Sequence, residues 1–120
     1  GKPMSCASLV AQKMGASDEE MAAVAGYAGG LGLSGNSCGA LSAAIWMQTL
    51  NWCKENPGQS PPYFTNKGAK RLIKEFTKYT KGEMLCKNIT NKDFRDINDH
   101  SEFINKGGCD ELIDILSSTD

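Results

Sequence analysis

The hydrophobic and polar positions of this sequence predict a chain built from helices. Apolar side chains recur every three or four residues along most of the length, which places them on one face of a helix. No stretch alternates between apolar and polar residues as a half-buried strand does. We therefore expect an all-α fold, a small irregular bundle of about five to six helices with a glycine-rich turn before the central helix.

Two serines mark the starts of the first two predicted helices. Ser5 can cap a helix that carries the first cysteine. Ser17, with Glu20 three residues later, forms the capping-box pattern that opens a second helix. The glycine-rich run at residues 29–35 follows, and so many glycines do not stay helical. The sequence therefore predicts two short helices and then a turn.

Three further helices are predicted after this turn. The central helix should start near Ser37 or Cys38 and end before Asn56, where a Pro-Gly pair follows. A fourth helix is expected over residues 66–79, and a last one is expected to open at Cys109. Their predicted buried side chains are Leu72, Phe76 and Tyr79 in the fourth helix and Leu112, Ile113 and Leu116 in the last.

The remaining segments bear on domain organisation. The polar stretch 88–106 should form short helical turns on the surface, with His100 solvated among acidic neighbours rather than acting as a ligand. A length of 120 residues suits one domain, 1–120, although the proline-containing loop near 57–64 could divide it into two subdomains. No run of about 18 apolar residues is present, so we expect no transmembrane helix.

The charge balance excludes two classes of partner. The net charge is -1, from 13 basic and 14 acidic residues, which leaves no electrostatic footprint for nucleic acid or for an anionic membrane. Basic residues do gather between Lys67 and Lys81, and we interpret them as a solvated helix face. Neither a nucleic acid nor a membrane is therefore expected as a partner.

The cysteines carry the candidate chemistry. Five are present, an odd number with long spacings, which does not fit a secreted disulfide scaffold. No C-x-x-C motif occurs, so the sequence contains neither a zinc ribbon nor a thioredoxin motif. The C-x-x-C-H motif that attaches haem covalently is absent as well. This use of cysteine favours a reducing compartment and a cytoplasmic location. Export stays open, because the natural start of the chain can lie before Gly1.

Three cysteines fall at predicted helix starts, namely Cys6, Cys38 and Cys109. Unpaired backbone N–H groups and the positive end of the helix dipole stabilise an anion there, including a thiolate. One interpretation makes Cys38 a thiolate with a lowered pKa, and the other makes it a buried small hydrophobe. If the helix starts converge, they form a positive pocket suited to several thiolates.

Cys53 behaves differently from the other cysteines. One helix running from Cys38 to Cys53 separates their sulfurs by on the order of 20 Å. The two cannot share a cluster or a disulfide. We therefore predict that Cys53 is a bystander, and the candidate set is Cys6, Cys38, Cys86 and Cys109.

Short motifs occur along the chain in a recognisable order. They are Ser5-Cys6-Ala7, Gly29-Gly30, Cys38-Gly39-Ala40, Phe76 ahead of Cys86, and Cys109 before the last helix. In this arrangement the chain resembles the C_GCAxxG_C_C family of redox-active proteins, from about residue 4 to residue 116. The family's four cysteines fall on the candidate set above. One departure is that the last glycine of the C-G-A-x-x-G motif is Ala43 here.

The resemblance implies redox activity without naming a reaction. A similar domain forms part of split-Soret cytochromes, which implies iron–sulfur binding, whereas the haem half of that analogy does not apply here. We expect the four cysteines to hold an iron–sulfur cluster of unspecified type for electron transfer to an unidentified redox partner protein. The alternatives are a thiol–disulfide oxidoreductase with Cys38 as nucleophile, and a structural zinc or interaction module with inert cysteines. A homodimer through the third helix is a further expectation.

Overall fold

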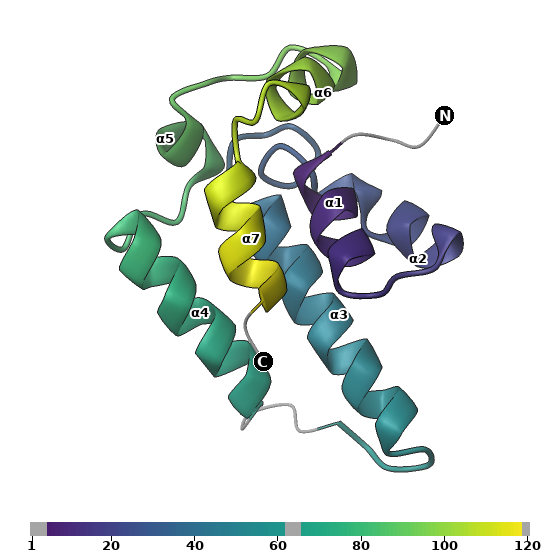
Figure 1. Ribbon diagram of the computed structural model, residues 1–120. Coiled ribbons are helices and arrows are strands. Elements are labelled where there is room, and N and C mark those ends of the chain that lie inside the picture. Colours follow the sequence, from purple (N-terminus) through teal and green to yellow (C-terminus); the bar gives the residue numbers. More distant parts are fainter. Residues whose placement is uncertain (1–4, 62–65, 119–120) are drawn as a thin grey trace.

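The computed structural model describes residues 5–61 and 66–118, and the regular elements within these ranges are helical (Figure 1). In chain order they are α1 (Cys6–Lys13), α2 (Asp18–Ala23), the 3₁₀ turn η1 (Ala25–Tyr27), α3 (Gly39–Glu55), α4 (Lys67–Thr80), α5 (Cys86–Thr90), α6 (Ile97–Asn105) and α7 (Asp110–Ser118). The all-α prediction is confirmed. The described ranges hold seven α-helices rather than five or six, because the stretch predicted as surface turns forms the separate short helices α5 and α6.

The first two helices begin where their serines predict. The Ser5 hydroxyl accepts a hydrogen bond from the N–H of Ser8 at 3.1 Å, and the backbone N–H of Ser5 donates in return to the Ser8 hydroxyl. At the second start, the N–H of Glu20 donates to the Ser17 hydroxyl, and the Glu20 carboxylate accepts from the N–H of Ser17 at 2.9 Å. Each capping box satisfies backbone donors that a helix start leaves unpaired.

Helix α3 is the centre of the molecule. It contacts α1, α4 and α7, which lie around it, and α7 also contacts α1 and α4 (Figure 1). Its small buried residues Ala40, Ala43 and Ala44 let these neighbours approach closely, and Met47 fills the space further along. The helix ends at Glu55, as predicted. The expected loop near 57–64 follows, and its residues 62–65 lie outside the described part of the chain.

Helices α4 and α7 bury all but one of the side chains expected of them. Leu72 and Phe76 of α4 are buried, as are the three predicted side chains of α7. Tyr79, expected on the same stripe as Leu72 and Phe76, is 42% exposed, so that prediction is wrong. Its position near the end of α4 brings its hydroxyl to the surface, where it donates to the Glu111 carboxylate at 2.9 Å. Among the described residues, no helix is both long and apolar enough to cross a bilayer.

Candidate functional site

A left-handed loop between η1 and α3 shapes the site. Gly29, Gly30 and Gly32 have positive φ angles, and so do Leu31 and Leu33 between and after them. Residues other than glycine rarely adopt this conformation. The backbone of the loop is therefore locally strained, and the surrounding structure must stabilise it. A Cβ at Gly30 would lie 2.7 Å from the Cβ of Cys86. The absence of a side chain there lets the loop and the start of α5 touch.

Cys38 is the residue that caps the start of α3. Its side chain forms no capping hydrogen bond with the described residues, but the nearby backbone groups of Leu41 and Ala40 act to lower the pKa of its thiol, as the positive helix start predicts. The next residue, Gly39, has no room for a side chain, because an added Cβ would collide with the backbone carbonyl of Tyr27. The motif glycine therefore lets η1 pack directly against the first turn of α3. At the departure from the motif, Ala43 is fully buried and its methyl group is accommodated.

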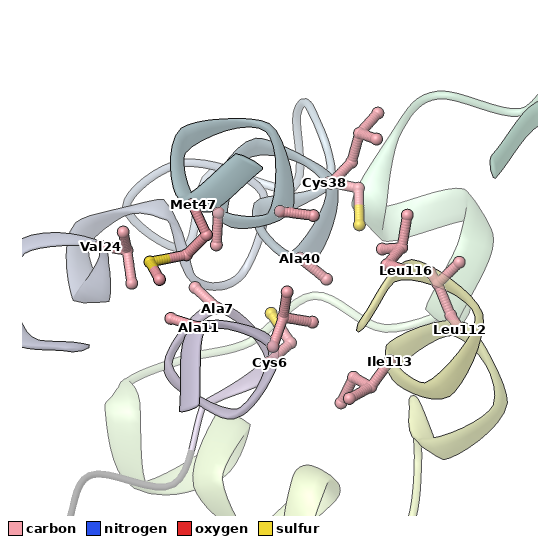
Figure 2. Close-up of a cluster of buried hydrophobic side chains, with 14 of the residues drawn as sticks. Cys6, Ala7, Ala11, Val24, Cys38, Ala40, Met47, Leu112, Ile113 and Leu116 are labelled. Carbon is pink, nitrogen blue, oxygen red and sulfur yellow. The ribbon is translucent and has the colours of Figure 1, made fainter. Parts of the chain in front are cut away.

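Cys6 is the first residue of α1 and is buried against the same region. The backbone groups of Gly29 and Ala7 lie near its thiol and act to lower the thiol's pKa. Figure 2 shows Cys6 on α1 and Cys38 at the start of α3, both among the apolar side chains that α7 contributes to the core. The left-handed loop thus supplies a backbone donor to one candidate cysteine and a contact to another.

The other two candidate cysteines also stand at helix starts. Cys86 opens the short helix α5, and its N–H donates to the carbonyl of Asn36 at 2.6 Å, which ties α5 to the loop before α3. Cys109 immediately precedes α7 and is half-buried, and its carbonyl accepts from the N–H of Ile113 at 2.9 Å. All four candidate cysteines are free thiols.

The four thiols lie close enough to affect one another's ionisation. Burial, and then the thiolates of Cys38 and Cys86, raise the pKa of Cys6 to about 12. Burial and then the Cys38 thiolate raise the pKa of Cys86 to about 11. The pKa of Cys109 is raised by burial and then by Cys6, Cys38 and Cys86. Every pair in the set therefore interacts, which places the four sulfurs in one region.

Cys53 lies outside this region. It sits in the last turn of α3, whereas Cys38 caps the first turn, so the helix separates the two by on the order of 20 Å. It is not among the charges that raise the pKa of any of the four. The structure thus places the predicted set together and Cys53 apart, although the role of each cysteine remains a prediction.

Of the two interpretations of Cys38, the structure supports the buried thiol and not the thiolate with a lowered pKa. The backbone groups of Leu41 and Ala40 at the helix start do act to lower the pKa. Burial outweighs them, because Cys38 is only 7% exposed and a charge there loses its hydration, so the pKa is raised. The helix start was correctly identified from the sequence, whereas the burial that decides the sign of the shift comes from tertiary packing.

The sulfur positions do not form a ready-made ion site. Within the described ranges, no group of three or more His, Cys, Asp or Glu side chains is arranged to hold a metal ion. The donor set itself suits a thiolate-ligated group, since four thiolates are the ligand set of such groups. The thiols therefore fit an iron–sulfur group in number and chemistry. The four sulfurs would move into ligand positions only when the group binds.

His100 is a site residue that the sequence interpretation missed. It is 1% exposed rather than solvated, and its Nε2 accepts a hydrogen bond from the N–H of Cys6 at 3.3 Å. Phe94 packs edge-on against its ring with centroids 4.7 Å apart. Its Nδ1 finds no partner within the described part of the chain. Burial lowers its pKa, so the ring is neutral and its accepting nitrogen faces α1.

Replacing His100 by alanine should cost about 2–3 kcal/mol of stability. The change leaves a cavity beside Phe94 and removes the acceptor of the Cys6 N–H. His100→Gln should recover part of this loss, because its side-chain oxygen can accept the same N–H. Urea unfolding of the three proteins measures the difference. Variants as stable as the parent would show that the hydrogen bond contributes nothing.

The metal-free, reduced protein should lose stability as the pH rises above about 9. The folded-state pKa values of Cys6 and Cys86, about 12 and about 11, exceed the ordinary value of 9.0. Folded thiols then hold protons more tightly than unfolded ones. Their contribution is complete below the unfolded pKa and is lost as the pH rises through the folded values.

Urea unfolding near neutral pH and at about pH 10.5 should differ by on the order of 1 kcal/mol or more. Cys86→Ala should show a shallower decline, since it removes one of the raised groups. Lysine and tyrosine ionisation affects both proteins alike. Parallel declines in the two proteins would therefore contradict this account of the alkaline instability.

The fold and the site define an all-helical protein that gathers four free thiols around the start of its central helix. The chain belongs to the C_GCAxxG_C_C family, whose model, described as "Putative redox-active protein (C_GCAxxG_C_C)", matches residues 4–117. No curated protein and no solved structure matches the chain. The resemblance stated from the motifs is confirmed, and the family description supports redox activity in general terms.

Proposed function

We propose that Cys6, Cys38, Cys86 and Cys109 bind an iron–sulfur cluster and that the protein transfers electrons through it. The observation that carries this proposal is that, in every pair of these four cysteines, the charge of one raises the pKa of the other. Cys53 is not among the charges that do so. Four thiolates are the ligand set of [2Fe–2S] and [4Fe–4S] clusters. When bound, such a cluster accepts and releases single electrons.

The raised pKa values support ligation over free thiolate chemistry. At neutral pH, burial and mutual repulsion keep these thiols protonated, so none is poised as a nucleophile. A bound cation compensates the repulsion and displaces the protons, because a coordinating thiol is deprotonated outright. The same values argue against Cys38 as the nucleophile of a thiol–disulfide oxidoreductase.

The arrangement of the thiols is not that of a site for a single zinc ion. A tetrahedral site with Zn–S bonds of about 2.3 Å holds its sulfurs about 3.8 Å apart. No group of three ligands among the described residues is arranged for one ion. A cluster contains several atoms and holds its thiolates farther apart than one ion does. Sulfurs that share a region without forming a single-ion site therefore suit the larger group.

The chain itself supplies the surroundings of the thiols. Backbone groups of Gly29, Ala40 and Leu41 lie where they act to lower the pKa values of Cys6 and Cys38, so they favour the charged thiolates. Apolar side chains of α7, including Leu112 and Leu116, exclude water from the same region (Figure 2). Hydrogen bonds to sulfur and exclusion of solvent are the factors by which a protein sets the reduction potential of an iron–sulfur group.

Anaerobic reconstitution with ferrous iron and sulfide tests the proposal. We expect a brown protein with about two or about four irons per chain, matching sulfide, and an absorption band that bleaches on reduction. A parallel sample is given zinc alone. Colourless protein without bound iron after reconstitution would overturn the proposal. Stoichiometric zinc binding in its place would support the structural zinc site instead.

A further inference from the structure

Helix α4 carries a concentrated positive charge on one face. Lys67, Lys70, Arg71, Lys74 and Lys78 fall within a sector about 100° wide when the helix is viewed along its axis. The opposite face buries Leu72 and Phe76. Five cations and the single carboxylate of Glu75 give α4 a charge of +4. Because the net charge of the whole chain is -1, the residues outside α4 together carry -5.

The lysines of the positive face, defined as the five basic residues above, differ from several lysines elsewhere in the chain. Lys13 pairs with Asp114 at 2.6 Å, and Lys54 pairs with Glu20 at 2.9 Å. Across the described ranges, the four lysines of the positive face have no such partner, although all four are exposed. Like charges three and four residues apart destabilise a helix. These four lysines therefore repel one another, and no ion pair of their own among the residues that the structure describes offsets the repulsion.

The C-terminal end of the positive face lies beside the thiols. Tyr79 follows Lys78, and its hydroxyl donates to Glu111 in the first turn of α7. Glu111 lies two residues after Cys109, so this hydrogen bond holds the end of α4 near the start of α7. Cys109 is half-buried, whereas the other three candidate cysteines are buried. The positive face thus ends near the most accessible of the four thiols.

We propose that the positive face of α4 is the docking site for an acidic surface of a redox partner protein. The proposal rests on the proposed function, since docking there brings the partner close to Cys109. Exposed apolar side chains on α4 and just after it, Ile73, Tyr79 and Met84, supply the contact area that a protein partner uses and a phosphate backbone does not. The negative remainder of the chain repels an extended polyanion.

Binding of oxidised flavodoxin, a small acidic electron carrier, tests this surface. The full chain is titrated before and after reconstitution, and chemical shifts locate the contact. We expect shifts on α4 and near Cys109, and an affinity that falls about tenfold between about 50 mM and about 300 mM salt. The triple change Lys70→Glu, Lys74→Glu and Lys78→Glu should weaken binding at least about tenfold at low salt.

A second variant makes the same charge change outside α4, with Lys13→Glu, Lys54→Glu and Lys106→Glu, and should bind within about twofold of the parent. These lysines pair with carboxylates, so circular dichroism checks that the variant remains helical. Equal weakening in both variants, or shifts away from α4, would overturn the docking site. So would tighter binding of duplex DNA or of anionic vesicles through the same lysines. Because binding is measured with and without the cluster, a failed reconstitution and a failed docking site give separate results.

Discussion

Cys109→Ala should lose at least about nine-tenths of the iron that the reconstituted parent protein binds, whereas Cys53→Ala should bind as much as the parent. The two cysteines are matched, because each is a free thiol with intermediate exposure. Neither change removes a fully buried side chain, so both variants should fold. They differ in place: Cys109 interacts with Cys6, Cys38 and Cys86, and Cys53 lies at the far end of α3.

Iron and sulfide analysis after anaerobic reconstitution measures this difference, and circular dichroism checks that both variants remain helical. Full iron content in Cys109→Ala would remove this residue from the ligand set. Equal loss in both variants would show that the iron is bound without regard to the four-thiol region. The comparison therefore tests the selection of the four cysteines independently of which cluster type forms.

Local signals were enough to predict most of the helical framework. Serine caps, the Pro-Gly pair after α3 and the three- and four-residue apolar spacing depend on neighbouring residues, so they can be read along the chain. The starts at Ser5 and Ser17 and the end at Glu55 lie where these signals place them. The separation of Cys53 from Cys38 followed in the same way, since one helix has a fixed rise per residue.

The properties that escaped prediction depend on contacts between distant segments. His100 was assigned to the surface from its acidic neighbours, yet α6 folds back and places it against Cys6, 94 residues earlier in the chain. The helix start of Cys38 left open whether its pKa is lowered or the thiol is simply buried, and packing around that start removes water and raises the pKa. Helix position is encoded locally, whereas burial is decided by tertiary packing.

The glycine loop is intermediate between these cases. Its composition predicted a break in helical structure, which the structure confirms. Composition does not specify that Leu31 and Leu33 also take positive φ angles, or that Gly30 will touch Cys86. These features arise because the loop must reach both α1 and α5, so several segments together determine its path.

Gly39→Ala should destabilise the protein by about 3 kcal/mol or more, although alanine is ordinarily the better residue in a helix. The added methyl group would meet the backbone carbonyl of Tyr27, and a backbone group cannot rotate aside as a side chain can. That carbonyl also accepts the N–H of Leu31 at 2.9 Å, so a shift would disturb the left-handed loop. Gly26→Ala is the matched control, since nothing lies within 4 Å of its added Cβ.

The two variants should therefore separate in both stability and chemistry. Gly26→Ala should unfold within about 1 kcal/mol of the parent in urea and bind the same amount of iron. Gly39→Ala should unfold at lower urea and bind less iron, because the loop that it displaces holds Gly29 against Cys6 and Gly30 against Cys86. If Gly39→Ala were as stable as Gly26→Ala, the close approach of η1 to α3 would not be needed. A stable Gly39→Ala variant that lost its iron would instead show that the motif glycine serves the four-thiol region alone.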